Sequence, residues 1–135
     1  MTAKAAPTNR FALRGWRIAF IGYATLLTIG THWPNLQIDA PVIERPDLLL
    51  HVICFGLLAA LLLAARFFDA ELLSGRNLGW SFAVALAWSG LDELSQGLPY
   101  IHRYVVWSDF FANALGVSLV ILAAYLWRWK RTSAW

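Results

Sequence analysis

The chain has 135 residues, of which 59% are hydrophobic and only 14% are charged, and its mean hydropathy is +0.55. This composition lies outside the range of an ordinary water-soluble domain and predicts an integral membrane protein. The net charge of +3 can be explained by attraction to anionic lipid, and the sequence contains no nucleic-acid-binding motif, so nucleic acid is not an expected partner.

Four apolar stretches predict helices over residues 11–31, 48–68, 78–96 and 110–127. Each approaches the about 20 residues that are needed to cross about 30 Å of hydrocarbon. No cleavage site of the Ala-x-Ala kind follows Gly30, so the first stretch is expected to remain part of the protein. The predicted fold is all-α: an integral membrane four-helix bundle that forms a single domain over residues 1–135.

The charges divide unevenly between the two sides of these four stretches. One side carries nine basic and two acidic residues, whereas the other carries two basic and six acidic residues. Because cytoplasmic loops of membrane proteins are enriched in Lys and Arg, this asymmetry predicts cytoplasmic N- and C-termini. The acidic side, which also carries all three histidines, is then expected to face outward.

Polar side chains gather near the outward ends of three of the predicted helices, where an ionisable group needs a specific reason to be present. Pairs three or four residues apart share a helix face. The candidate ligand-binding residues are Asp47, His51, Glu93, Gln96, Arg103, Asp109 and Asn113. We expect them to form a shallow pocket that is open outward.

Several of these residues also have a structural interpretation. Asp47 and Asp109 each begin an apolar helix, where a carboxylate can cap free N–H groups. Asn113 can bond a neighbouring helix while Gly116 lets two backbones approach. Glu93 lies near the end of its helix, where the dipole disfavours a carboxylate, so it needs a cationic or donor partner.

Arg103 can fill two different roles. If Arg103 pairs with Glu93 or Asp92, the cluster is a salt-bridged latch between the third and fourth helices, and otherwise Arg103 can recognise an anion such as phosphate.

Other kinds of site have weaker support in the sequence. The histidines His32, His51 and His102 show no metal-binding spacing, and neither a metal nor a cofactor is expected. We expect His32 and His102 to be ordinary interfacial residues. No serine stands in a nucleophile-elbow motif. Cys54 is the single cysteine and is expected to be a small buried apolar residue.

The ordered series from Asp47 to Gly116 resembles the VanZ-like family of small integral membrane proteins. The resemblance rests on three groups of residues: Asp47, His51 and Phe55; Glu93 and Gln96; and Arg103, Asp109, Asn113 and Gly116. The sequence departs from the family pattern at Leu48, where many members have lysine, and in a turn before Arg103 that is one residue longer. The family takes its name from a teicoplanin-resistance protein, and the resemblance implies a cell-envelope role in a bacterial-type cytoplasmic membrane without implying a reaction.

Three functions remain open at this level. The first is binding of an anionic lipid or a lipid-linked cell-wall precursor, with Arg103 on a phosphate. The second is an enzyme that acts on such a lipid, with Glu93 as general acid or base and His51 or Asp109 orienting it. In the third, the polar residues only hold the helices together and the protein works through partner contacts.

Overall fold

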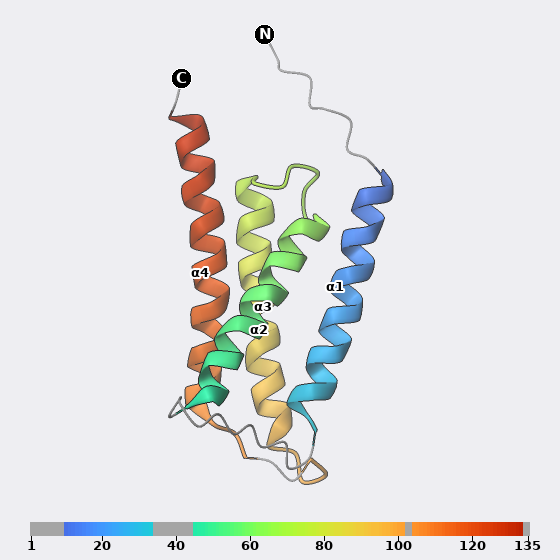
Figure 1. The fold of residues 1–135 in the computed structure, drawn as a ribbon, viewed down its shortest axis with the longest axis vertical. Coiled ribbons are helices and arrows are strands. Elements are labelled where there is room, and N and C mark those ends of the chain that lie inside the picture. The colour runs from blue at the N-terminus through green and yellow to red at the C-terminus, as the bar shows by residue number, and fades with distance from the viewer. Residues whose placement is uncertain (1–9, 34–44, 102–103, 134–135) are drawn as a thin grey trace.

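The computed structural model describes residues 10–33, 45–101 and 104–133, and these residues form four helices and no strand. The helices are α1 (Arg10–Thr31), α2 (Pro46–Ala65), α3 (Gly75–Gln96) and α4 (Trp107–Thr132). The four predicted helices are therefore confirmed, with α2 beginning and ending slightly earlier than expected, α3 and α4 beginning three residues earlier, and α4 ending at Thr132 and not at residue 127. Successive helices run in opposite directions (Figure 1).

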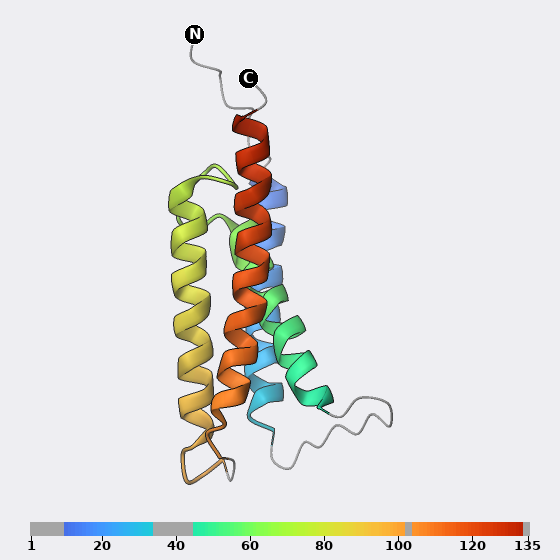
Figure 2. The same cartoon turned by 90° about the vertical axis from the view of Figure 1, so that its left-hand side faces the viewer.

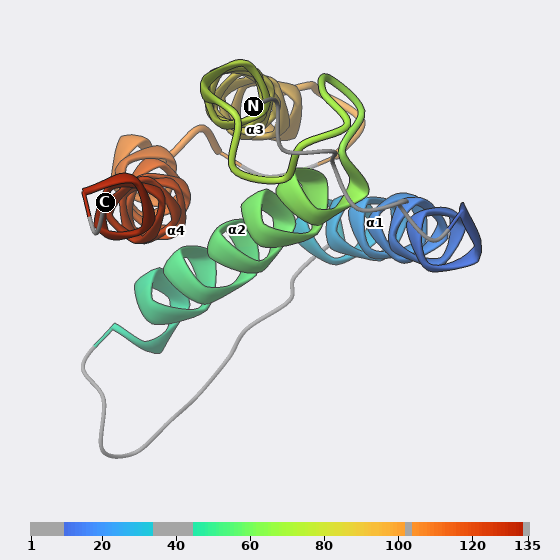
Figure 3. The ribbon, with the colours of Figure 1, turned by 90° about the horizontal axis from the view of Figure 1, so that it is seen from above.

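Helix α2 lies at the centre of the arrangement. It packs against all three other helices and most extensively against α4, whereas α1 contacts α2 and a short part of α3 but, within the described residues, does not contact α4. Seen from one end, α2 runs obliquely between α1 and α4, and α3 lies along one side of α2 (Figure 3). The side view shows α3 and α4 lying side by side (Figure 2).

Two glycines explain how closely α2 and α4 approach each other. A Cβ atom on Gly116 would overlap the carbonyl oxygen of Val52, and a Cβ atom on Gly56 would lie 3.3 Å from the carbonyl oxygen of Gly116. Only residues without a side chain allow two helix backbones to come so near. The α2–α4 contact fixes the positions of the polar residues that both helices carry.

The connection between α2 and α3 is held by polar side chains that bond to backbone carbonyls. Arg66, the residue that follows the last residue of α2, adopts a left-handed conformation with φ of 49°. The Arg17 guanidinium of α1 donates to the carbonyls of Ala65 and Arg66 at 3.2 and 3.4 Å. Asn77, which is fully buried near the start of α3, donates to the carbonyl of Leu63 at 3.0 Å. These bonds satisfy carbonyls that a helix end leaves without partners.

Helix α3 has an unusually polar packing face and an unusually apolar outer face. The buried face of α3 is mostly polar, and its polar members are Asn77, Ser81, Ser89, Asp92, Glu93 and Gln96. By contrast, large apolar side chains such as Trp80 and Leu91 of α3 are more than half exposed. This is the reverse of the pattern in a water-soluble protein, where polar residues are mostly exposed.

Two of the described helices, α2 and α4, are long and apolar enough to cross a membrane. A core helix of a soluble protein can have the same length and composition, but it is then largely covered by protein. In α4 only 22% of the most apolar stretch is buried. Large apolar residues along this helix, including Leu115, Leu119, Leu122 and Leu126, are about half exposed.

Candidate functional site

The predicted site residues that the structure describes, which are all except Arg103, lie at the end of the molecule where α1 and α3 finish and α2 and α4 begin (Figure 1). Here His51 of α2 meets two side chains of α4. Its Nδ1 atom lies 2.9 Å from Asn113 Oδ1 and its Nε2 atom lies 3.5 Å from Asp109 Oδ2. An amide oxygen only accepts, so Nδ1 donates this bond. The carboxylate of Asp109 faces α2 and also accepts a hydrogen bond from the Ser108 hydroxyl.

Glu93 of α3 is 1% exposed and has a donor partner, as its position required. Its Oε1 atom accepts a short hydrogen bond from the backbone N–H of Val106, the residue that precedes α4. Its Oε2 atom is buried without a hydrogen-bond partner in the described residues. Glu93 therefore connects the end of α3 with the start of α4 through a backbone group.

A second polar network joins α1 to α3, and it was not expected from the sequence. Thr31 donates a hydrogen bond of 2.8 Å to Asp92 Oδ1, and Gln96 Nε2 donates one of 3.2 Å to Asp92 Oδ2. His32 Nε2 lies 2.9 Å from Ser95 Oγ, and His32 Nδ1 lies 3.7 Å from Asp92. Gln96 thus pairs with Asp92, four residues earlier, and not with Glu93.

The sequence contained a signal for this second network. Asp92 and Gln96 share a face near the end of α3. Thr31 and His32 lie at the end of α1, and because successive helices alternate in direction, α1 and α3 finish at the same end of the molecule. His32 was expected to be an ordinary interfacial residue, and the structure instead places it in direct contact with α3.

Asp47 lies apart from these networks, at the exposed start of α2. Its carboxylate accepts hydrogen bonds from Arg45 at 2.8 and 3.2 Å, and both side chains are about half exposed. Such an exposed pair contributes little to stability. Arg103 and His102 lie outside the described residues, so the expected contacts of Arg103 with Glu93, Asp92 or an anion stay predictions.

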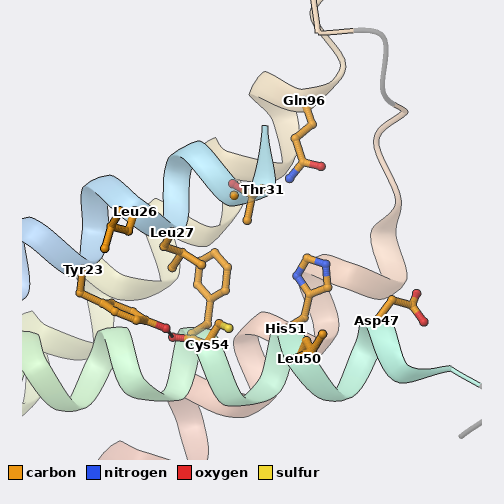
Figure 4. Close-up of a pocket in the computed structure, with 11 residues that line it drawn as sticks. Tyr23, Leu26, Leu27, Thr31, Asp47, Leu50, His51, Cys54 and Gln96 are labelled. Atoms are coloured by element: carbon orange, nitrogen blue, oxygen red, sulfur yellow. Dashed lines mark hydrogen bonds between the residues drawn. The ribbon is translucent and has the colours of Figure 1, made fainter. Parts of the chain in front are cut away.

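A groove of about 410 Å³ lies between α1 and α2 and reaches the polar end of the molecule (Figure 4). Its wall is mostly apolar and includes Leu26, Leu27, Leu50 and Phe55. At its deep end the Tyr23 hydroxyl donates a hydrogen bond of 3.0 Å to the carbonyl of Cys54. The groove therefore has an apolar body, and the end far from its mouth is closed by this hydrogen bond between α1 and α2.

The mouth of the groove is polar, and its polar lining residues are Thr31, Asp47, His51 and Gln96. In Figure 4, His51 projects from α2 between Gln96 on one side and Asp47 on the other. Of the three candidate catalytic residues, His51 lines the groove, whereas Glu93 and Asp109 do not. An apolar cavity with a few convergent polar groups is the usual form of a small-molecule site.

Cys54 also differs from its expected place. It is half-buried in the wall of the groove and is not part of the fully buried core (Figure 4). No disulfide is possible within a chain that has one cysteine. Because Cys54 is the single cysteine and lines the groove, the rate of its reaction with a thiol reagent can be used to measure whether the groove is filled.

The described residues do not contain three metal-ligating side chains grouped as a metal site. The arrangement of Ser95, His32 and Asp92 has the residue types of a hydrolytic triad, but the Ser95 hydroxyl donates to the carbonyl of Asp92 at 2.8 Å, and Ser95 does not line the groove. Its geometry fits a connection between α1 and α3 better than a nucleophile.

Comparison of the chain with protein-family models, with curated proteins and with solved structures gives no match. The resemblance to the VanZ-like family therefore stays a prediction, carried by the residues from Asp47 to Gly116. The geometry of the site is the basis for the functional argument.

Proposed function

We propose that this chain is a multi-pass membrane protein that binds a lipid or a lipid-linked cell-envelope component in the groove between α1 and α2. All four helices span the bilayer in this proposal, with both termini on the cytoplasmic side and the mouth of the groove in the outer leaflet. The resemblance to the VanZ-like family supports a role in the envelope, and resistance to a glycopeptide such as teicoplanin is one form that this role can take.

The observation that carries the proposal is the match between the polarity of the groove and that of a lipid. Apolar side chains line the body of the groove, and Thr31, His51, Gln96 and Asp47 lie at its mouth. A lipid has the same order of parts, because its hydrocarbon chain is followed by a polar headgroup. Inside a bilayer a hydrocarbon chain only exchanges one apolar environment for another, so the apolar body accommodates the chain through packing, and the polar mouth provides the selectivity.

The membrane part of the proposal is supported by the exposed apolar surface and the polar interior. Side chains such as Leu119 and Leu122 need an apolar environment, whereas the amide groups of Asn77 and Gln96 of α3 donate to partners inside the protein. Membrane helices commonly use small and polar residues at their mutual contacts for this reason. The basic residues of α4's last turn, Lys130 and Arg131, suit the cytoplasmic surface.

Topology can be tested with two cysteine substitutions in a Cys54→Ala chain. Leu98→Cys reports on the end that carries the groove mouth, and Ser133→Cys reports on the opposite end. A membrane-impermeant maleimide added to intact cells should label Leu98→Cys alone, and both after the cells are opened. Labelling of Ser133→Cys in intact cells would contradict the proposed orientation.

Lipid binding can be tested on the unmodified chain, because Cys54 lies in the groove wall. A lipid in the groove should slow the reaction of Cys54 with maleimide, whereas the rate for unfolded protein should not depend on lipid. An anionic headgroup held by Arg103 predicts that Arg103→Ala weakens protection by phosphatidylglycerol. Equal Cys54 labelling with and without every lipid tried would reject the binding function.

An enzyme that acts on the bound lipid is the second candidate, and the placement of His51 favours it. His51 lines the groove and its Nε2 atom lies 3.5 Å from the buried Asp109, so its ring is nearer to a bound ligand than the carboxylate of Glu93, which does not line the groove. Lipid turnover that is lost in His51→Gln but kept in Glu93→Gln would support this candidate. If polar substitutions only unfold the protein and no lipid binds, the third function, through partner contacts, is favoured.

A further inference from the structure

The polar side chains at the mouth of the groove offer it more hydrogen-bond acceptors than donors, because the donors of Thr31 and His51 are directed at other parts of the protein. The Thr31 hydroxyl is directed at Asp92 and at the carbonyl of Thr28, which are both acceptors. The His51 Nδ1–H group is directed at Asn113 on α4. The donors of these two groove-lining residues are thus already engaged within the protein.

The hydrogen-bond acceptors at the mouth, in contrast, are not all engaged within the described part of the protein. Gln96 donates through Nε2 to Asp92, a carboxylate that can only accept, and this bond fixes the orientation of the amide. Its Oε1 atom accepts no hydrogen bond within the described part of the chain, and Figure 4 shows it on the side away from Thr31. Across the mouth, Asp47 presents a carboxylate that is about half exposed and that accepts from Arg45 and from backbone N–H groups at the start of α2, so it offers acceptors and no donor.

We infer that the ligand of this groove carries hydrogen-bond donors, an ammonium or hydroxyl group, on the part of its headgroup that meets Gln96 and Asp47. This inference rests on the proposed lipid-binding function and adds the chemical class of the headgroup. A carbonyl or phosphate oxygen placed against Gln96 Oε1 and the Asp47 carboxylate would face acceptors, which costs binding free energy because none of these oxygens supplies a proton. A phosphate elsewhere in the headgroup is compatible with this arrangement.

Phosphatidylethanolamine and phosphatidylcholine form a matched pair of probes. Both are zwitterionic and both carry a phosphate, but only the ethanolamine group has N–H donors. In detergent micelles that contain either lipid, the rate of Cys54 labelling by maleimide measures occupancy of the groove. We expect phosphatidylethanolamine to protect Cys54 at about one tenth of the mole fraction that phosphatidylcholine needs, which corresponds to about 1.4 kcal/mol.

Substitutions identify the acceptors. Gln96→Met removes the amide oxygen at similar volume, and we expect it to bring the tenfold ratio close to one. Leu94→Met is the control, because Leu94 lies on the exposed face of the same helix and should leave the ratio unchanged. If Gln96→Met does not fold, Asp47→Asn at the exposed start of α2 tests the second acceptor, and it should also reduce the ratio.

A third lipid, phosphatidylglycerol, distinguishes hydroxyl donors from ammonium donors, because its headgroup has hydroxyl groups and no ammonium group. Protection by phosphatidylglycerol that equals protection by phosphatidylethanolamine would show that hydroxyl groups suffice, and weaker protection would assign the preference to the ammonium group. Equal protection by phosphatidylethanolamine and phosphatidylcholine in the wild-type protein would overturn the inference while leaving lipid binding intact. Absence of protection by all three lipids would reject the proposed function itself.

Discussion

Thr31, the last residue of α1, donates a hydrogen bond of 2.8 Å to Asp92 Oδ1 on α3, although 61 residues separate them along the chain. Contact between α1 and α3 is confined to a short stretch, and α1 does not contact α4 within the described residues. The Thr31–Asp92 bond and the neighbouring His32–Ser95 contact therefore hold α1 in place at the mouth of the groove.

Thr31→Val should loosen α1 at this end, because it removes the donor but keeps the shape of the side chain. Hydrogen bonds to charged groups contribute roughly 1.5–3 kcal/mol, and about 1.4 kcal/mol corresponds to a tenfold change in an equilibrium. In the absence of lipid, we expect Cys54 of Thr31→Val to react with maleimide about tenfold faster than Cys54 of the wild-type protein. Thr25→Val is the control, since the Thr25 hydroxyl bonds only within α1, to the carbonyl of Ile21. Equal rates in both variants would exclude this role for Thr31.

Glu93→Gln should leave thermal stability unchanged or raise it. The substitution keeps an oxygen that can accept from Val106, and it removes a charge that is buried near Asp92 and Asp109. Glu93→Ala removes the acceptor as well, and it should lower the free energy of unfolding by roughly 1–3 kcal/mol because the N–H group of Val106 loses its partner. Thermal unfolding in mild detergent compares the two. A large loss of stability in Glu93→Gln would show that the charge itself holds α3 and α4 together.

Gly116→Ala should destabilise the fold by about 1–3 kcal/mol or more, because its Cβ atom would overlap the carbonyl oxygen of Val52 and force α2 and α4 apart. Gly22→Ala in α1 is the matched control, since a Cβ atom there meets nothing within 4 Å. Thermal unfolding of both variants provides the measurement. Similar melting temperatures would mean that α2 and α4 tolerate a wider separation than the structure shows.

Gly30→Leu should fill the groove without disturbing the fold. Gly30 lines the groove, and a Cβ atom built on it meets nothing within 4 Å. We expect this variant to keep its melting temperature, and we expect Cys54 labelling to become slow and independent of lipid. Gly22→Leu carries the same change two helical turns earlier, away from the groove, and should retain lipid-dependent protection. Lipid-dependent protection in Gly30→Leu would place the lipid elsewhere.

The helices could be predicted from the sequence because the apolar runs are long and are separated by clear breaks. The sequence also predicted that His51, Asp109 and Asn113 belong to one polar cluster, since all three lie within the first two turns of helices that begin at the same end of the molecule. It did not predict which of these side chains contact each other. Glu93 was correctly expected to need a donor, but a backbone N–H group such as that of Val106 has no signature in a sequence.

The groove could not be predicted from the sequence. It depends on the oblique course of α2, which separates α1 from α4, and this course depends on the close approach at Gly56 and Gly116. The role of His32 was missed for a related reason, because a histidine at a helix end is usually solvated and only the position of α3 gives it a partner. Both the groove and the contact of His32 with α3 depend on how the helices pack against one another, which the sequence alone does not show.

The polar face of α3 has a consequence for the biogenesis of the protein. If the chain is inserted into a bilayer during synthesis, α3 brings Asp92 and Glu93 with it, and each ionised group costs about 2.5–3.5 kcal/mol near the centre of an isolated membrane helix and less toward its end. The partners that compensate for this cost lie in α1, which is made earlier, and beside α4, which is made later. Stable residence of α3 in the membrane would then depend on the emergence of α4 from the ribosome, so truncation after α3 should leave a chain that is retained by the insertion machinery or degraded.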